Sequence, residues 1–183
     1  PRELVDVAVS NPSYFPPGGG CMYSNTNYVL LGMIVEQVTG HTFEEELASR
    51  ISGPLGLTHT YMAGDPALSG EHARGYGFDE ESGERYDLTD YLDPSITWTA
   101  GGMVSTLEDL RAWGRALAEG ELLSPQLREK MTSDMLEMPG MEECFGYSML
   151  YGLAVMDLGG WLGHSGMQPG YSSAVFYFPA QEA

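Results

Sequence analysis

The sequence predicts an α+β fold in a single domain, from two patterns and their order along the chain. Apolar residues recur at helical spacing in several separate segments before residue 140. After Gly146 the pattern changes to short aromatic and β-branched runs divided by glycine, which is typical of strands. Helices therefore come first and strands last, whereas an α/β fold would alternate them. We expect residues 1–140 to form mainly a helical lobe with loops, and residues 141–183 to form sheet strands.

Two helices are expected before residue 41. Residues 2–9 resemble the end of a helix, and the run SNPSYFPPGGG breaks it because proline and glycine do not continue helices well. After Asn25 an apolar series with helical spacing begins, and Gly40 is a natural stop for that second helix. The apolar positions of this series are Val29, Leu30, Met33, Ile34 and Val38.

Capping signals mark three further helices. Thr42 to Glu45 form a capping box, and we expect the helix that follows to end before Gly53-Pro54. Ser105 to Glu108 form a second capping box, and Ser124-Pro125 start the third helix with serine as the cap and proline in the first turn. Residues 64–100 are expected to be rich in loops. The inner face expected for the helix after Ser105 consists of Leu107, Leu110, Trp113, Gly114 and Leu117.

Three runs after Gly146 predict consecutive antiparallel strands. They are YSMLYGLAVMDL, GGWLGHSG and GYSSAVFYF. So few strands make a poor sheet, and its exposed edge would be a liability. The chain also starts as if already inside a helix and stops just after an apolar strand, so we expect it to be a piece of a longer protein.

The charge of the chain excludes several classes of function. The 26 acidic and 8 basic side chains give a net charge of −18, which repels phosphate backbones and anionic membranes. No apolar run approaches the ~18 residues of a membrane span, and the N-terminus shows no signal peptide. The acidic run at residues 79–93 lacks the residue order of a calcium-binding loop, so we expect a solvated loop there.

The two cysteines, Cys21 and Cys144, lie far apart in the sequence and form no metal-ligand cluster. They could pair in an oxidising compartment or remain two small core residues, and we favour free thiols. The sequence implies no metal and no cofactor.

Tyr23 and Asn25 form the first candidate site, just before a helix. In an extended or turn backbone, residues two apart point the same way, so the phenol and the amide could enter one cleft together. The alternative is a plain helix start, with Asn25 as the cap and Tyr23 as a lid over the first turn.

A second candidate site is His164-Ser165-Gly166, at the end of an expected strand. Gly163 and Gly166 bracket the histidine, so a ligand backbone could lie against that strand edge. The alternative is a strand histidine bonded to a backbone carbonyl. Gly101-Gly102, before a capped helix, is either a cleft wall or a loop.

Taken together, these motifs resemble the serine β-lactamase and penicillin-binding protein superfamily. The segments that carry the resemblance are YSN, the helix NYVLLGMIVEQVTG, GPLGL, AGGMVSTLEDLRAWGRAL and HSG before a strand. Their order and spacing hold across almost the whole chain, and the similarity is closest to the class C β-lactamase and D-alanyl-D-alanine carboxypeptidase branch. The resemblance implies an antiparallel sheet flanked by helices with a helical lobe, a β-lactamase/transpeptidase-like fold that is incomplete in this chain.

The resemblance also implies roles for the candidate residues. Tyr23 would relay protons as general acid or base, and Asn25 would hydrogen-bond the substrate amide. The strand with His164, Ser165 and Gly166 would hold the substrate, with His164 as a second catalytic residue. The amide of Met167 would lie near the oxyanion, and Trp98 would wall the cleft.

The chain departs from the family in its missing nucleophile. The family places S-x-x-K before Y-x-N, and its serine forms the acyl-enzyme. No serine here is followed three positions later by lysine; the single lysine, Lys130, is preceded at that position by Leu127. We expect that the N-terminal part has been cut away, and the alternative is a noncatalytic relative.

The expected function is that of a serine hydrolase acting through an acyl-enzyme on a β-lactam, a peptide ending in D-alanine or an ester. This chain alone is expected to be inactive without the upstream S-x-x-K, and the alternative is a noncatalytic penicillin-recognising or ligand-binding module. The expected partner is a small-molecule or peptide substrate, with no nucleic acid. The family resemblance implies an extracytoplasmic location.

Overall fold

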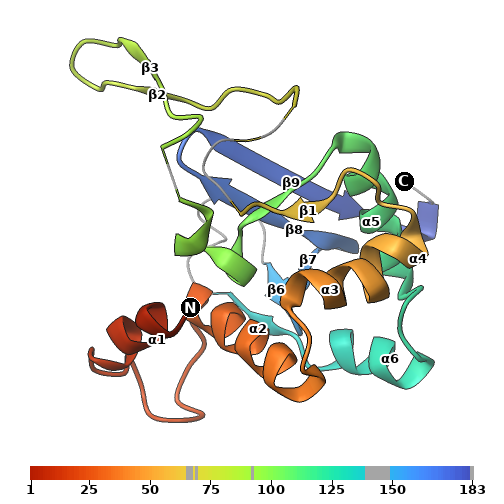
Figure 1. Ribbon diagram of the computed structural model, residues 1–183. Coiled ribbons are helices and arrows are strands. Elements are labelled where there is room, and N and C mark those ends of the chain that lie inside the picture. The colour runs from red at the N-terminus through yellow and green to blue at the C-terminus, as the bar shows by residue number, and fades with distance from the viewer. Residues whose placement is uncertain (65–67, 69, 92, 139–148, 182–183) are drawn as a thin grey trace.

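The computed structural model describes residues 1–64, 68, 70–91, 93–138 and 149–181, and Figure 1 shows their arrangement. The α-helices are α1 (Arg2–Val9), α2 (Asn25–Thr39), α3 (Phe43–Leu47), α4 (Gly53–Leu55), α5 (Leu107–Glu119) and α6 (Pro125–Ser133). The shorter helical turns are η1 (Ala48–Ser52), η2 (Pro94–Ile96), η3 (Trp98–Ala100) and η4 (Pro179–Gln181). The strands are β1 (Tyr61–Met62), β2 (Tyr76–Phe78), β3 (Arg85–Asp87), β4 (Met103–Val104), β5 (Leu136–Glu137), β6 (Leu150–Tyr151), β7 (Met156–Leu158), β8 (Trp161–Gln168) and β9 (Tyr171–Tyr177).

A five-stranded sheet has the order β5-β6-β7-β8-β9, and every neighbouring pair is antiparallel. The antiparallel strands expected near the end of the chain are confirmed. One difference is that the run from Tyr147 to Leu158 contains two strands, β6 and β7, and its first two residues lie outside the described part. The turn between them includes Ala154 at φ 60°, and the amide of Gly152 donates to the carbonyl of Val155.

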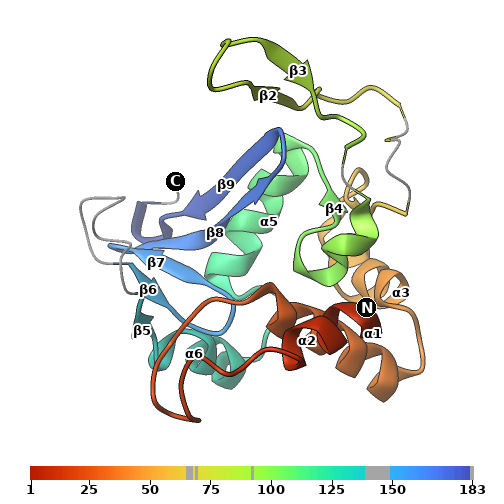
Figure 2. The same ribbon diagram turned by 90° about the vertical axis from the view of Figure 1, so that its left-hand side faces the viewer.

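Helix α5 covers one face of β8 and β9 (Figure 2). A side chain at Gly114 would lie only 2.7 Å from the Val175 side chain, so glycine permits this close approach. Tyr177 Oη also donates to Glu119 at 3.2 Å. The prediction that Leu107 lies on the inner face is wrong, because Leu107 begins the helix and remains 87% exposed.

The cap of α5 is Thr106, one residue later than the expected Ser105. The Thr106 hydroxyl accepts the amide of Asp109 at 3.2 Å, whereas the Ser105 hydroxyl bonds to that of Thr60 at 2.8 Å. The other two capping predictions are confirmed, since Thr42 forms a complete capping box and the Ser124 hydroxyl accepts a helical amide.

The helix that starts after Thr42 does not end before Gly53-Pro54, so that prediction is wrong. It continues through the wide turn η1 into α4 and ends at Gly56, which has φ 66°. The amide of Gly53 donates to the carbonyl of Ala48, five residues earlier, and a side chain at Gly53 would lie 2.7 Å from that oxygen. Pro54 is tolerated because it occupies the first turn of α4.

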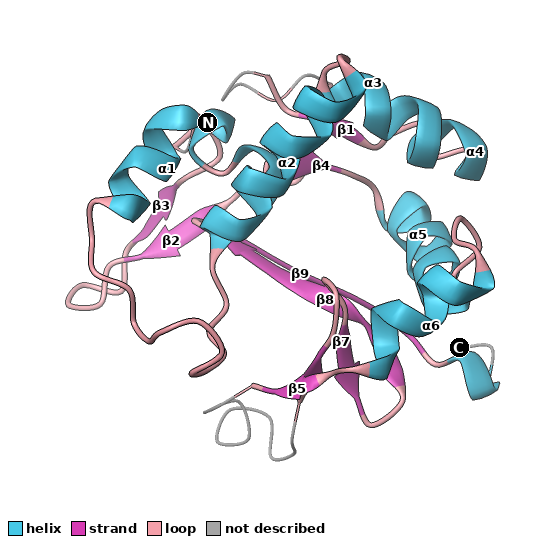
Figure 3. Cartoon of the chain, turned by 90° about the horizontal axis from the view of Figure 1, so that it is seen from below, coloured by secondary structure: helices cyan, strands magenta, loops and turns pink. Residues whose placement is uncertain are grey.

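Helix α2 packs against η3 through a small residue. A side chain at Gly32 would lie 2.5 Å from Thr99, and the Thr99 hydroxyl donates to the carbonyl of Tyr28 at 2.9 Å. The expected stop at Gly40 is confirmed by its φ of 74°. Of the expected apolar positions, Val29 is buried, whereas Ile34 and three others are only partly covered or exposed. Figure 3 shows α1 to α4 arranged in an arc beside the sheet.

The acidic run begins in a hairpin, β2–β3, that projects from the rest of the protein (Figures 1 and 2). Asp79 closes its turn by accepting the amide and the hydroxyl of Ser82, at 2.7 and 2.8 Å. The side chains of residues 79–86 are exposed, as expected for a solvated segment, but the backbone is ordered as a two-stranded ribbon.

Candidate active site

Tyr23 lies immediately before α2. The N-cap of this helix is Ser24, in extended conformation, and Asn25 is the first helical residue rather than the cap. The Tyr23 ring packs against Tyr28 in the first turns of the helix, with centroids 5.5 Å apart. Tyr23 nevertheless keeps 39% of its surface exposed, so it both covers the start of the helix and faces solvent.

Tyr23 is part of a cluster of four rings, here called the ring cluster: Tyr23, Tyr28, Tyr151 and His164. The centroid of Tyr23 lies 5.9 Å from that of Tyr151 and 6.0 Å from that of His164. Tyr151 and His164 meet nearly edge to face, with centroids 5.6 Å apart. Two of the residues come from α2 and its entrance and two from the sheet, so the structure brings the two sequence motifs together.

A row of hydrogen bonds runs through the ring cluster. The hydroxyls of Tyr28 and Tyr151 are hydrogen-bonded to each other. The Tyr151 hydroxyl also bonds to Nε2 of His164 at 2.9 Å. On its other side, Nδ1 of His164 lies 2.5 Å from the carbonyl oxygen of Ser165. The alternative considered for His164, a bond to a backbone carbonyl, is therefore present together with its contact to Tyr23.

The surroundings of Tyr23 and Tyr151 favour the protonated form of both phenols. Burial, and then the neighbouring Tyr28, raise the pKa of Tyr23 above its ordinary value. Burial, and then the hydrogen bond with Tyr28, raise the pKa of Tyr151. A general base needs the opposite shift, which a nearby cation would supply. Among the described residues, no lysine or arginine contributes to the shift in the pKa of Tyr23.

The strand that carries His164 has a free side next to the ring cluster. Strand β7 pairs with β8 only from Trp161 to Gly163, whereas β9 pairs with β8 as far as Gln168. Among the described residues, no strand therefore pairs with residues 164–168 on the β7 side. Backbone groups on a free strand edge can bind an extended ligand chain.

The three residues after His164 lie along this end of β8. Ser165, Gly166 and Met167 are exposed, with Met167 at 86%. The Ser165 hydroxyl makes a weak contact with the sulfur of Met156 at 3.9 Å. A side chain at Gly166 would meet the Ser173 hydroxyl at 2.8 Å, so this position is narrow on the β9 side.

Within the described part of the chain, the Trp98 ring does not stack on the ring cluster and the Asn25 side chain makes no hydrogen bond with it. Trp98 packs edge to face against Phe43, with centroids 6.2 Å apart. Its φ of 39° is unusual for a bulky residue and stores strain of about 1–3 kcal/mol. Asn25 is exposed, and its side chain makes no hydrogen bond with another described residue. Their binding roles stay predictions.

Tyr28 and Tyr151 were missed by the sequence reasoning. Tyr28 follows Asn25 by three residues and so lies on the same helix face, which is a signal that could have selected it. Tyr151 gives no comparable signal, since its position depends on how β6 folds back on β7.

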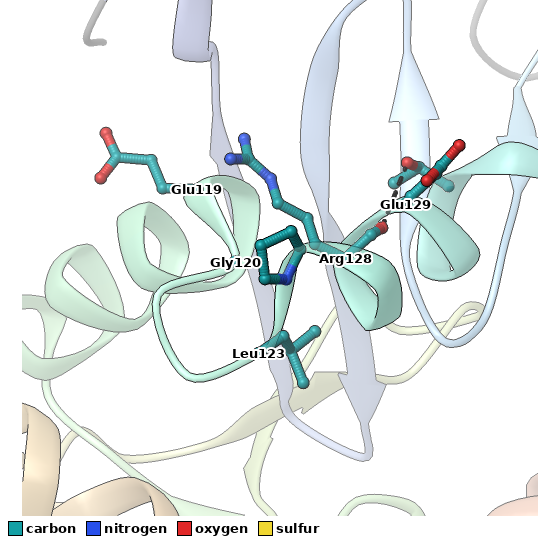
Figure 4. Close-up of a pocket in the computed structure, with 7 residues that line it drawn as sticks. Glu119, Gly120, Leu123, Arg128 and Glu129 are labelled. Carbon is teal, nitrogen blue, oxygen red and sulfur yellow. Dashed lines mark hydrogen bonds between the residues drawn. The ribbon is translucent and has the colours of Figure 1, made fainter.

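The ring cluster is separate from a depression at the junction of α5 and α6, with a volume of about 490 Å³ (Figure 4). Its lining includes Arg128, whose guanidinium donates to the carbonyl of Ala118 at 3.2 Å. No residue of the ring cluster lines it. The described residues also include no group of three histidine, cysteine or acidic side chains able to hold a metal. Cys21 is a free cysteine, in agreement with the expected free thiol, and Cys144 lies outside the described residues.

Comparison with known proteins now decides the family. A profile of the family described as Beta-lactamase matches residues 1–183, the whole of the chain. The chain belongs to the beta-lactamase family. This confirms the resemblance seen in the motifs, and the β-lactamase/transpeptidase-like α+β fold with it.

Three relatives within or near the family are informative. Penicillin-binding protein 4* of Bacillus subtilis is 28% identical over 189 residues, which cover 97% of this chain and 42% of that protein. A D-stereospecific amidohydrolase from Streptomyces sp. is 32% identical with a TM-score of 0.85, covering 97% of this chain and 52% of that one. D-amino acid amidase from Ochrobactrum anthropi SV3, complexed with D-phenylalanine, is 28% identical with a TM-score of 0.82, covering 99% and 54%. The chain thus spans about half the length, or less, of these relatives.

Proposed function

We propose that the whole protein to which this chain belongs is a serine hydrolase that transfers an acyl group to water through an acyl-enzyme. The observation that carries the proposal is the contact between Tyr23 and His164, beside the free edge of β8. A phenol and an imidazole next to a free strand edge are suited to holding a carbonyl substrate and moving protons around it.

The roles of the residues follow from the family resemblance and this geometry. Tyr23 relays protons to and from the nucleophile and the leaving group, and His164 supports it. Asn25 hydrogen-bonds the substrate amide at the entrance to α2. Four further residues complete the binding surface. Ser165 and Gly166 lie along the substrate backbone, the Met167 amide lies near the oxyanion, and Trp98 forms a wall of the cleft.

The substrate class proposed first is an amide or short peptide of a D-amino acid. Both solved relatives described above are amide hydrolases by name, one D-stereospecific and one specific for D-amino acids. β-Lactams and esters are the further substrates to test, because they share attack on a carbonyl and water as the final acceptor.

The nucleophile is proposed to come from sequence outside this chain. The chain contains no serine followed three positions later by lysine. The raised pKa of Tyr23 also leaves the phenol protonated at neutral pH, so it is a poor base on its own. This chain by itself is therefore proposed to be inactive, and the same two observations would suit a noncatalytic binding module.

The experiment compares this chain with the protein encoded by its complete reading frame. Each is incubated with a chromogenic D-phenylalanine anilide, a chromogenic cephalosporin and a p-nitrophenyl ester. We expect no turnover above buffer by the chain alone. The complete protein should hydrolyse at least one substrate, and Tyr23→Phe should reduce this by about 100-fold or more.

The control is Tyr91→Phe, at a ring that is 70% exposed, which should leave turnover unchanged. A complete protein that forms no acyl adduct detectable by mass spectrometry with any substrate would favour the binding module. Turnover by the chain alone, lost in Tyr23→Phe, would refute its proposed inactivity.

An extracytoplasmic location is part of the proposal, by analogy with penicillin-binding relatives such as that of Bacillus subtilis. Within the described residues, no helix combines the length and the apolar character that crossing a membrane would demand. This finding concerns only those helices and leaves the location to fractionation of cells that express the complete protein.

A further inference from the structure

The hydrogen bonds in the ring cluster have a donor-to-acceptor direction, which is fixed by a backbone carbonyl of β8. Nδ1 of His164 lies 2.5 Å from the carbonyl oxygen of Ser165. A carbonyl oxygen only accepts, so the nitrogen at this distance must carry a hydrogen. An imidazole that is neutral has one N–H, and here it is on Nδ1.

The position of that hydrogen decides the role of Tyr151. Nε2 of the neutral ring then carries a lone pair and can only accept, so the Tyr151 hydroxyl, at 2.9 Å, must donate to it. A hydroxyl has one hydrogen, so Tyr151 cannot also donate to Tyr28. Tyr28 therefore donates to Tyr151, and the direction runs from Tyr28 through Tyr151 and His164 to the carbonyl of Ser165.

We propose that Tyr151 is a positioning residue that holds neutral His164 in the Nδ1–H tautomer, and that this task does not require the hydrogen bond from Tyr28. Neither tyrosine needs to touch a substrate. Tyr151 is half-buried. The His164 ring has one hydrogen bond at each nitrogen, with Tyr151 at Nε2 and the carbonyl of Ser165 at Nδ1. The raised pKa of Tyr151, caused first by burial, agrees with a phenol that keeps its hydrogen for donation.

The titratable rings in contact with His164 are Tyr23, from the entrance to α2, and Tyr151, from β6. Tyr28, from α2, and the thiol of Cys21 act on Tyr151 behind it. Within the described residues, no lysine, arginine, aspartate or glutamate makes an ion pair with His164. The tautomer is therefore set by the two hydrogen bonds and not by a neighbouring charge.

One consequence rests on the proposed function. While Tyr151 donates to Nε2, this nitrogen cannot take a proton from Tyr23 or from a substrate. Protonation of His164 would reverse the row of bonds, because Nε2–H would donate to Tyr151 and Tyr151 would then donate to Tyr28. The group to which each of the two tyrosine hydroxyls donates therefore depends on whether His164 is neutral or charged.

The test is nitrogen-15 NMR of the histidine side chains in the 183-residue chain, at about pH 8.5, where an ordinary imidazole is neutral. Long-range proton–nitrogen spectra distinguish a ring nitrogen that carries hydrogen from one that does not. His164 is assigned by the loss of its signals in His164→Gln. We expect Nδ1 to be protonated and Nε2 to be free of hydrogen. The reverse pattern in the wild-type chain would by itself overturn the proposal.

Three variants separate the hydroxyl from the packing of the rings. Tyr151→Phe removes the donor, so we expect the single Nδ1–H pattern to be lost in favour of a mixture or of Nε2–H. Tyr28→Phe keeps the Tyr151 hydroxyl and should keep the pattern. The control Tyr171→Phe, which removes a hydroxyl bonded to the carbonyl of Ala73, should also keep it.

An unchanged pattern in folded Tyr151→Phe would overturn the proposal, and so would an equal loss in Tyr28→Phe and Tyr151→Phe, since packing would then set the tautomer. If Tyr151→Phe does not fold, the wild-type pattern decides by itself. None of these readouts needs hydrolysis, so their failure is distinguishable from failure of the proposed function.

Discussion

The ring of Tyr23, before α2, lies with its centroid 6.0 Å from that of His164, in β8. This contact joins the helical part of the chain to the five-stranded sheet. Its position depends on two separate supports, since α2 is held by its packing on η3 and β8 by its pairing with β7 and β9. The effects of substitutions at Tyr23 and of substitutions in β8 should therefore be separable by experiment.

The first prediction concerns alkaline pH. Burial is the main cause that raises the pKa of Tyr23 and of Tyr151. Each phenol stays neutral in the folded protein while the unfolded chain ionises, so its contribution to stability is present below a pH of about 10 and is lost as pH rises further. We expect the free energy of unfolding in urea to fall as pH rises above about 10, with a smaller fall in Tyr151→Phe. Equal slopes in wild type, Tyr151→Phe and the exposed-site control Tyr91→Phe would contradict this.

The sequence allowed the two halves of the candidate site to be named because motifs are local. Tyr23 stands before a recognisable helix start, and His164 stands between two glycines on a strand. Helix ends were likewise predictable where one residue decides them, as at Thr42 and Gly40. Such signals need only the chemistry of a few neighbouring residues.

Features that depend on distant contacts escaped the sequence reasoning. The helix after Thr42 passes Gly53-Pro54 because a wide turn closes on Ala48, which local rules for proline do not anticipate. Ser105 has capping chemistry, but its hydroxyl bonds to Thr60 and the cap moves to Thr106. Tyr151 reaches the ring cluster because β6 pairs with β7.

The second prediction concerns acid pH and Glu46. This buried carboxylate accepts a hydrogen bond from His41 at 2.7 Å and another from Arg50. The bond with His41 first, and then that with Arg50, lower the pKa of Glu46. A lowered pKa adds stability that is present above the unfolded value of about 4.3 and is lost as pH falls through the folded value. We expect Glu46→Gln to flatten the fall in unfolding free energy between about pH 5 and 3, measured in urea.

The control for Glu46 is Glu44→Gln, two residues earlier on the exposed side of α3. It should follow the wild-type acid dependence. A Glu46→Gln protein that loses stability in acid as steeply as wild type would show that the bonds to His41 and Arg50 carry no such effect.

The third prediction contrasts two glycines of β8. A side chain at Gly163 would lie 1.9 Å from the backbone oxygen of Val175, which cannot move without breaking the β8–β9 pairing. Gly163→Ala should therefore cost about 3 kcal/mol or more and should change the NMR signals of His164. At Gly166 the nearest atom is the Ser173 hydroxyl, at 2.8 Å, which can rotate away. Gly166→Ala should cost less than about 1 kcal/mol. Equal losses in the two variants would contradict this account of the strand.

The fourth prediction concerns Asp109, which is 5% exposed and whose carboxylate binds two groups about 50 residues away in the sequence. One carboxylate oxygen accepts the amide of His59 and the hydroxyl of Thr60, both at 2.8 Å. Removing it leaves the part-buried amide of His59 without a protein acceptor, while Thr60 can still bond to Ser105. We expect Asp109→Ala to lower the free energy of unfolding by about 2–3 kcal/mol, measured in urea.

Asp109→Asn keeps an oxygen that can accept the His59 amide, so it should lose about 1 kcal/mol. The control Glu108→Gln, at an exposed residue, should stay within about 0.5 kcal/mol of wild type. Equal stability of Asp109→Ala and Glu108→Gln would show that solvent satisfies the His59 amide and that this carboxylate does not fasten α5 to the loop before β1.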